Sequence, residues 1–382
     1  MQRSASSDQG TTSPITPAVR ILIAGGGTGG HIIPALAIAD ELKAQHGAEI
    51  VFVGTARGLE SRLVPQAGYP LELIRVGQLN RVSLATRLRT LIDLPLGLWQ
   101  CIRLLRSFRP DVVIGVGGYA SGPAMGTAIL LGIPTLAFEP NAVPGLANRL
   151  VGSRVKAAAV NFEPAARYFR NAYITGIPVR AEFFHLAARP VGAAPHLLVF
   201  GGSQGARVLN ALMPKIAASL LQEIPGLTIL HQAGARHVES TLAAYQASGT
   251  PANRWQVEAF LDDMPRRFEA ADLVLARSGA STVAELAAAG KPAVLVPLPT
   301  AADDHQRKNA EVMAQAGAAR VLLEPDLTPA QLQGTLSDLL TQPDTLKTMA
   351  ENARSLAHPD AAERIARMAM ALARRDFRKE AF

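Results

Sequence analysis

The stretch ILIAGGGTGGH, residues 21–31, is the pattern from which the rest of the chain can be ordered. A short apolar run, typical of a buried strand, ends in five glycines and one threonine, and HIIPA then opens a helical pattern. Glycines let the backbone approach an anion closely, and the free N–H groups and dipole of a helix start favour negative charge. This strand, turn and helix predict a phosphate site with His31 at its mouth.

The same order recurs in the second half of the chain. HLLVF (196–200) runs into GGSQGA (201–206), and a helical pattern follows from Arg207. Aligning Ile21 with Leu197 gives an offset of 176 residues, close to half the chain. One glycine-rich loop is as readily explained by a tight turn, but two loops in matching positions favour a function.

Composition indicates a globular protein with an anionic partner. The 382 residues are 48% hydrophobic and 18% charged, and the formal net charge is +7. That length suffices for two or three domains. Residues 75–109 contain seven arginines and only one acidic residue, Asp93. The single cysteine, Cys101, cannot form an internal disulfide and fits a reducing cytosol.

Apolar runs alternate with helical patterns along the whole chain, which predicts an α/β fold with parallel sheets covered on both faces. We expect helices at 34–45 and 83–108, the second broken at Pro95. No uncharged apolar stretch is long enough to cross a bilayer, so we expect no membrane span. The expected organisation is a flexible tail (1–18), an N-terminal domain (19–178), a linker (179–195), a C-terminal domain (196–358) and a C-terminal helix (359–382), whose return to the N-terminal domain stays open.

A nicotinamide enzyme is one alternative for the first loop, since Gly25, Gly27 and Gly30 satisfy G-x-G-x-x-G. That fingerprint requires an acidic residue after the second strand to bind a ribose. Here the second strand ends in VGTAR (53–57) without an acid. Arg57 is suited to a 2′-phosphate, but this interpretation leaves the second glycine-rich loop unexplained.

The segment DLVLARSGASTVAE (272–285) is the most informative part of the second half. Thr282 and Glu285 have the spacing of a capping box, so Glu285 either closes a helix start or accepts the hydroxyls of a ribose. Gln306 is suited to a sugar hydroxyl or is a polar residue at a helix start. Histidines are scattered, no cysteine pair exists and no Asp-x-Asp occurs, so we expect no metal and no other cofactor.

Seven motifs in order resemble one family: GGGTGGH (25–31), GGYASGP (117–123), EPN (139–141), GIPVR (176–180), GGSQGA (201–206), RSGASTVAE (277–285) and DHQRKNA (304–310). These motifs are similar to those of the MurG-type bacterial peptidoglycan glycosyltransferases. That family moves N-acetylglucosamine from UDP-N-acetylglucosamine to lipid I, an undecaprenyl-pyrophosphoryl-MurNAc-pentapeptide, and so makes lipid II. The resemblance covers about residues 19–375 and implies the GT-B fold, with two Rossmann-like domains facing a central cleft.

The resemblance also implies roles for individual residues. The donor would contact the first loop, the segment after the fifth strand, and the C-terminal domain. Arg180 and Ser203 would lie at the diphosphate, Leu261 would meet the uracil through its backbone, Glu285 would bind the ribose, and Gln306 would hold the sugar. The full implied set of substrate-binding residues is Thr28, Gly29, Gly30, Asn141, Arg180, Ser203, Leu261, Ala280, Ser281, Thr282, Val283, Ala284, Glu285 and Gln306.

An inverting transfer needs a base at the acceptor hydroxyl. His31 is the first candidate, because a helix start disfavours its charged form, and Glu139 is the second. The family commonly has His-Glu-Gln-Asn where this chain has Phe138-Glu139-Pro140-Asn141, so two polar groups are missing here.

The arginine-rich segment 75–109 interleaves with leucines and Trp99, which predicts a surface that rests on anionic lipid. The alternative is an ordinary amphipathic helix packed on the sheet. The family resemblance implies a peripheral protein at the cytoplasmic face of the cell inner membrane, with roles in cell-wall biogenesis, cell shape and cell division.

Other functions remain open at this stage. A UDP-N-acetylglucosamine 2-epimerase shares the GT-B architecture, and a non-catalytic sugar-nucleotide sensor would use the same loops. A nucleic-acid binder fits the basic charge, but only 5% of the residues are aromatic and they do not interleave with the arginines, so we expect no nucleic-acid partner.

Overall fold

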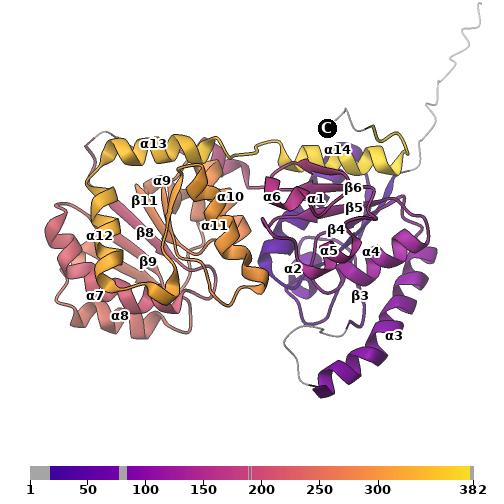
Figure 1. The fold of residues 1–382 in the computed structure, drawn as a ribbon, viewed down its shortest axis with the longest axis horizontal. Helices are drawn as coiled ribbons and strands as arrows, with labels where there is room; N and C mark the ends of the chain where they lie inside the picture. Colours follow the sequence, from indigo (N-terminus) through magenta and orange to yellow (C-terminus); the bar gives the residue numbers. More distant parts are fainter. Residues whose placement is uncertain (1–17, 77–83, 188, 191, 379–382) are drawn as a thin grey trace, which may run out of the picture.

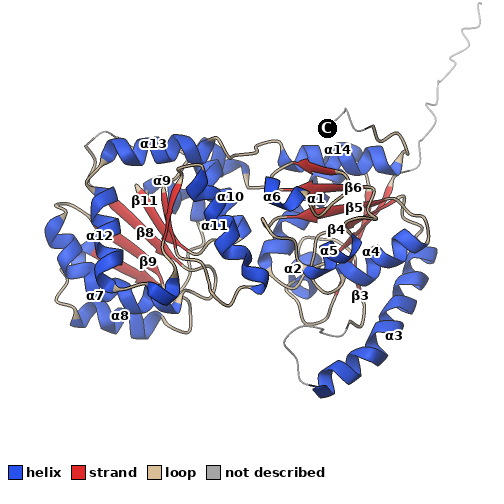
Figure 2. Ribbon diagram, viewed as in Figure 1, coloured by secondary structure: helices blue, strands red, loops and turns tan. Residues whose placement is uncertain are grey.

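The computed structural model describes residues 18–76, 84–187, 189–190 and 192–378. Two parallel β-sheets, each covered by helices on both faces, form two domains that lie side by side (Figures 1 and 2). The central strands are short apolar runs with mostly buried side chains, which is why they read as unbroken hydrophobic segments in the sequence, whereas the strands at the sheet edges are partly exposed. The α/β class and the two Rossmann-like sheets expected from the sequence are confirmed.

The first sheet has the strand order β3-β2-β1-β4-β5-β6-β7, with every pair parallel. Its strands are β1 (Arg20–Ala24), β2 (Glu49–Gly54), β3 (Leu71–Leu73), β4 (Val112–Gly115), β5 (Thr135–Glu139), β6 (Ala157–Val160) and β7 (Ala172–Ile174). Its helices are α1 (Gly29–His46), α2 (Glu60–Gln66), α3 (Leu84–Phe108), α4 (Ser121–Leu130), α5 (Leu146–Val151) and α6 (Glu163–Ala166).

The second sheet has the order β10-β9-β8-β11-β12-β13, again all parallel. Its strands are β8 (His196–Phe200), β9 (Thr228–Gln232), β10 (Trp255–Glu258), β11 (Leu273–Ala276), β12 (Ala293–Leu295) and β13 (Ala319–Val321). The α-helices are α7 (Arg207–Glu223), α8 (Val238–Ala247), α9 (Met264–Ala270), α10 (Ala280–Ala289), α11 (His305–Gln315), α12 (Pro329–Leu340), α13 (Pro343–Arg354) and α14 (Ala361–Ala373). Short 3₁₀ turns are η1 (Ala181–His185), η2 (Ala252–Arg254), η3 (Ala302–Asp304) and η4 (Glu324–Asp326).

The two sheets repeat one plan. In each, the first strand in sequence (β1 or β8) lies beside the fourth (β4 or β11), and the chain winds away in opposite directions from that pair. The glycine-rich loops follow β1 and β8, so both lie at this topological switch point. Ligands of open parallel sheets bind there, beyond the carboxyl ends of the strands.

Two expectations about helices are wrong. The first helix begins at Gly29 rather than Pro34, so Gly29, Gly30 and His31 form its first turn. Helix α3 continues through Pro95. A proline removes only one backbone donor, which is a small loss for a helix that is 25 residues long. The second half of α3 is also held in place: Gln100 Oε1 accepts from the N–H of Arg75 at 2.8 Å, and Gly97 packs on the Arg75 carbonyl.

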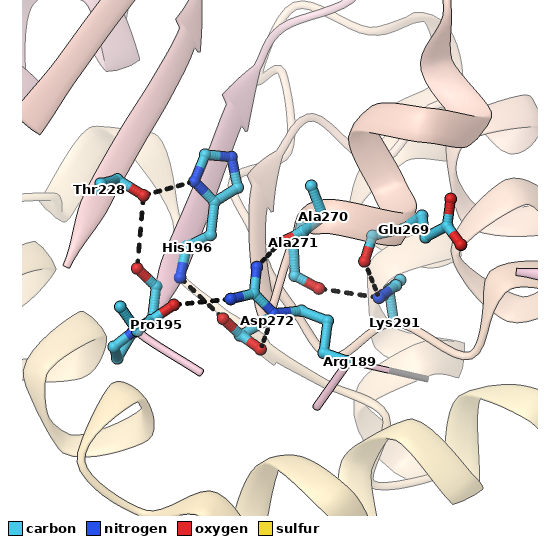
Figure 3. A network of polar contacts seen from close by, with 10 residues as sticks. Arg189, Pro195, His196, Thr228, Glu269, Ala270, Ala271, Asp272 and Lys291 are labelled. Atoms are coloured by element: carbon cyan, nitrogen blue, oxygen red, sulfur yellow. Dashed lines mark hydrogen bonds and ion pairs between the residues drawn. The ribbon is translucent and has the colours of Figure 1, made fainter. Parts of the chain in front are cut away.

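The segment after the first domain packs on the second. Phe183 of η1 is fully buried and meets Phe268 of α9 edge to face. Further along, Arg189 Nε pairs with Asp272 at 3.1 Å, and the other Asp272 oxygen accepts from the N–H of His196 at 2.7 Å (Figure 3). Residues 181–187 and 189–195 are therefore attached to the second domain where the structure describes them. The chain passes from the first domain to the second near residues 175–180, between the end of β7 and the start of η1.

The chain crosses back near residue 358. Gly176, with φ +79°, lies directly against the His358 side chain, so the two crossings touch. Helix α14 then lies over the first sheet (Figure 1), where Ile365, Met368 and Leu372 join the buried cluster around β1 and α1. The apolar face read in the last helix of the sequence covers the first domain.

Candidate functional site

The first glycine-rich turn is closed by the protein itself. Gly25, Gly26 and Gly27 have φ values of +148°, +140° and +93°, which only glycine adopts readily. Their N–H groups donate to the Val53 carbonyl, the Gly117 carbonyl and Glu60 Oε2. Each of these donors already has an acceptor within the protein, so these three glycines do not offer free N–H groups to a phosphate.

The donors that remain belong to the start of α1. The N–H groups of Thr28, Gly29 and Gly30 meet no acceptor in the described part of the chain, and Thr28 occupies the N-cap position without a side-chain cap. An anion or a developing negative charge fits this helix start. Thr28, Gly29 and Gly30 are also the residues of this loop for which the family resemblance implies contact with the donor.

His31 is the third residue of α1, next to those donors, and its ring lies against Gly117. Its Nδ1 is buried and has no hydrogen-bond partner in the described residues. Burial, followed by the electrostatic interaction with His305, lowers the pKa of His31 to about 4, while the Val116 carbonyl and Glu60 act in the opposite direction. The imidazole is therefore neutral at neutral pH and able to accept a proton.

The second glycine-rich loop is open by comparison. Gly202 and Gly205 have φ values near +80° and +70°, and the N–H of Gly205 closes a turn on the Gly202 carbonyl. The N–H groups of Ser203 and Gln204 have no acceptor within the described ranges, and both residues are exposed. These donors, at the entrance to α7, are suited to a phosphate.

A neutral, buried relay lies under this loop. Tyr245 OH is 3.1 Å from Nδ1 of His231, and Nε2 of His231 is 3.0 Å from Oδ1 of Asn210. Asn210 Nδ2 then donates to the Ala233 carbonyl at 2.9 Å. A methyl group at Gly205 would lie 1.9 Å from that carbonyl, so the relay fixes the strand end against which the loop rests. Burial lowers the pKa of His231 to about 3, which keeps the relay uncharged.

Asn309 of α11 joins the two domains. It is fully buried, its Oδ1 accepts from the N–H of Ala142 at 2.9 Å, and its Nδ2 donates to Asn141 Oδ1 at 3.2 Å. The same Nδ2 also lies 3.2 Å from the Ser278 carbonyl of its own domain. Arg149 and Asp303 add an ion pair of 2.8 Å across the same boundary. The loops after β5 and β11 are therefore held face to face.

Glu139 holds the first-domain side of this domain boundary in place. Only 1% of it is exposed, and its two oxygens accept from Asn141 N–H (2.9 Å), Asn141 Nδ2 (3.2 Å), Gly145 N–H (3.1 Å) and Asn148 Nδ2 (2.9 Å). Burial raises the pKa of Glu139, against the effect of these donors. A carboxylate with four internal donors orders its loop, which includes Asn141.

Helix α10 brings the predicted nucleotide residues into its first two turns. Its N-cap is Gly279, so the capping box expected from Thr282 and Glu285 is wrong; those residues lie inside the helix. Glu285 is free of that role, and burial raises its pKa to about 7, opposed by the positive charge of Arg180. Ser281 Oγ is buried and unpaired in the part of the chain described. The first two turns of α10 therefore present its uncapped N–H groups, the Ser281 hydroxyl and the Glu285 carboxyl.

The remaining predicted residues lie around the same edge. Gln306 is the second residue of α11, and its Oε1 accepts from the N–H of Leu298 at 3.0 Å, which leaves the amide nitrogen for a ligand. Leu261 is 3% exposed in the loop after β10, and Arg180 is exposed beside η1. In the described residues no group of three or more His, Cys, Asp or Glu side chains is placed to hold a metal ion.

Comparison with known proteins shows the family to which this chain belongs. Residues 21–160 match the glycosyltransferase family 28 N-terminal domain, and residues 196–365 match the glycosyltransferase family 28 C-terminal domain. A relative from Anaeromyxobacter dehalogenans is 47% identical over 94% of both chains. It is named UDP-N-acetylglucosamine--N-acetylmuramyl-(pentapeptide) pyrophosphoryl-undecaprenol N-acetylglucosamine transferase. This chain belongs to the MurG-type transferases of glycosyltransferase family 28.

The solved structures agree with that membership. MurG of Acinetobacter baumannii superimposes with a TM-score of 0.78 at 32% identity and covers 92% of this chain and 99% of its own. A Listeria monocytogenes structure assigned to the UDP-N-acetylglucosamine 2-epimerases reaches a TM-score of 0.65 at 13% identity, covering 95% of this chain and 98% of its own. The second likeness shows the shared GT-B fold alone. The MurG-type family and its fold are thus those that the seven motifs indicated.

Sequence reasoning missed several residues of this MurG-type site. Glu60, Asn210, His231 and Tyr245 were not singled out, and Asn309 was quoted within a motif without a role. These residues are far from the loops in the sequence and meet them only once the chain has folded: Glu60 is 33 positions from Gly27, and Asn309 is 168 positions from Asn141. The glycines at 54 and 58, both shortly before Glu60 in the sequence, were the available indication of a tightly enclosed side chain.

Proposed function

We propose that this protein transfers N-acetylglucosamine from UDP-N-acetylglucosamine to the C4 hydroxyl of the N-acetylmuramoyl unit of lipid I, forming lipid II. The main support is its 47% identity, over nearly the whole chain, to a transferase of that name. The site adds a physical reason: one loop offers free backbone donors for a diphosphate, and the other carries a neutral histidine.

The donor would bind mainly to the second domain. Its diphosphate would accept from the N–H groups of Ser203 and the α10 start, beside the Arg180 guanidinium. The uracil would meet the backbone at Leu261, the ribose would bind Glu285, and the sugar would meet the free amide of Gln306. Asn141, held by Glu139 and Asn309, would present its side chain from the opposite domain.

In the reaction, the acceptor oxygen forms a bond to the anomeric carbon from the face opposite the diphosphate. The bond from that carbon to UDP breaks, its electron pair leaves with the diphosphate, and the hydroxyl proton passes to the imidazole of His31. Donors at the second loop and the α10 start stabilise the charge that develops on UDP. We assign the base to His31 rather than Glu139, because the Glu139 oxygens already have four internal donors.

Labelled UDP-N-acetylglucosamine with and without lipid I tests this function. The proposal expects label in the lipid fraction only when lipid I is present. Conversion of the donor without lipid I would select the epimerase, and binding without turnover would select a sensor. The epimerase is supported only by fold likeness at 13% identity.

We also propose that the first domain rests on an anionic membrane at the cytoplasmic face of the inner membrane. No helix in the described residues is long and apolar enough to cross one. In the second half of α3, Trp99 is 58% and Leu96 41% exposed, and Arg103 lies over the Trp99 ring. An apolar anchor beside exposed arginines suits an anionic lipid surface. The other residues expected in this surface, between 77 and 94, lie outside the described side chains.

Vesicle sedimentation tests the membrane proposal with a matched control. W99A and R103A should each reduce binding to vesicles that contain anionic lipid, and added salt should weaken wild-type binding. Leu242→Ala removes an exposed apolar residue from the second domain and should leave binding unchanged. Wild-type binding that ignores both lipid charge and salt would refute the proposal.

A further inference from the structure

Glu60, the first residue of α2, has a buried carboxylate that no role described so far accounts for. Only 1% of the residue is exposed. Oε2 accepts from the N–H of Gly27 at 2.7 Å, and Oε1 accepts from the N–H and the hydroxyl of Thr55, each at 2.9 Å. Burying a carboxylate is costly unless donors compensate for lost water, and here three do.

Three glycines enclose this carboxylate. A methyl group placed on Gly26, Gly54 or Gly58 would lie 2.3, 2.4 or 1.9 Å from the Glu60 side chain. The first of these belongs to the glycine-rich turn itself, the second ends β2, and the third lies in the β2–α2 connection. The chain therefore removes side chains on three sides so that one carboxylate fits beneath the turn.

A neutral acceptor does not replace this carboxylate. Donors meet both oxygens, so a glutamine amide would turn its NH₂ group toward Gly27 or toward Thr55 and lose an acceptor there. In the described part of the chain no lysine or arginine forms an ion pair with Glu60. Its negative charge is thus available to a positive charge that forms nearby, and the neighbouring residue that gains one in the transfer is His31.

We propose that Glu60 is a positioning residue of the transfer reaction, which locks the Gly25–Gly27 turn so that His31 and the α1 start face the acceptor, and stabilises the imidazolium once His31 takes the proton. The kinetic part of this inference rests on the proposed function. Two ionisable groups act on His31: Glu60 of α2, which favours its protonated form, and His305 of α11, which opposes it.

Glu60→Gln tests the proposal, with Glu163→Gln as the matched control. Both residues open a helix, but Glu163 is exposed. E60Q should lower kcat about 10- to 100-fold, the range expected when a catalytic group is displaced by about an ångström. UDP affinity should stay unchanged, because the nucleotide binds the other domain. E163Q should behave as wild type.

A titration of His31 by NMR in the ligand-free protein gives a readout independent of turnover. H31A identifies the resonance. Removing a nearby negative charge destabilises the imidazolium, so E60Q should lower the pKa of His31, whereas Thr55→Val, which keeps the carboxylate and loses one donor, should not lower it. A wild-type kcat together with an unmoved His31 titration in E60Q would overturn the proposal, as would equal losses of kcat and UDP affinity. If wild-type protein fails to transfer, the function is refuted and the titration alone decides the Glu60 inference.

Discussion

The loop after β1 and the loop after β8 lie at the same point of their sheets but differ in what holds them. In the first, the N–H groups of Gly25, Gly26 and Gly27 are used within the protein, and the Glu60 carboxylate lies beneath them. In the second, the donors of Ser203 and Gln204 stay open above a neutral relay of Asn210, His231 and Tyr245. Under the proposed function, similar glycine patterns therefore serve different chemistry: the second loop offers donors to an incoming diphosphate, and the first positions His31 as the proposed base.

Replacing His31 separates the two loops most strongly. Without the imidazole the acceptor hydroxyl loses its base, so H31A should reduce kcat about 10²- to 10⁴-fold. The second loop is untouched, so UDP affinity measured by calorimetry should match wild type. A parallel loss of both quantities would assign His31 to donor binding and remove the contrast.

Two glycines of the second loop provide a matched pair. Gly202 and Gly205 both have positive φ, so alanine at either adds about 1–2 kcal/mol of strain. Only Gly205 also meets a backbone atom, the Ala233 carbonyl, while Gly202 has open space. G205A should weaken UDP binding by more than about tenfold beyond G202A. Equal effects in a binding titration would mean that the packing of the loop on β9 does not matter.

Asn210→Ala tests the relay. It leaves the His231 Nε2–H and the Ala233 carbonyl without their partner, and such buried unpaired groups cost about 1–3 kcal/mol. We expect that loss in chemical denaturation, together with a raised KM for the donor. Gln222→Ala, on an exposed part of the same helix, is the control. A stable variant with an unchanged KM would show that the relay does not support the loop.

The smallest expected effect concerns pH. The pKa of Glu285 lies near 7 in the free protein, because burial disfavours its charged form. An ionised carboxylate accepts both ribose hydroxyls, and a protonated one accepts less well. UDP affinity should therefore increase a few-fold as the pH rises through about 7, and E285Q should bind equally at pH 6 and pH 8. An increase that persists in E285Q would place the titrating group elsewhere.

Much of this molecule could be predicted from its sequence because local patterns determine it. Apolar runs predicted the strands, and the glycine-rich turns predicted which strand ends carry the site. The paired loops and the motif at 277–285 indicated the family that the relatives confirm.

What could not be predicted depends on contacts between distant segments. Whether Gly27 offers its N–H to a ligand depends on Glu60, and whether Asn141 faces the second domain depends on Asn309. The capping box failed for a local reason: the spacing of Thr282 and Glu285 fits one, but the helix begins earlier, at Ala280. Sequence spacing identifies candidate partners, and the fold decides which of them meet.

A structure of the protein with bound UDP-N-acetylglucosamine tests the central claim most directly. We predict diphosphate oxygens within hydrogen-bonding distance of the Ser203 or Gln204 N–H groups, with the Gly27 N–H still bound to Glu60 and His31 facing the sugar. A diphosphate seated on Gly25–Gly27 with Glu60 displaced, or one held by a divalent cation, would contradict this account.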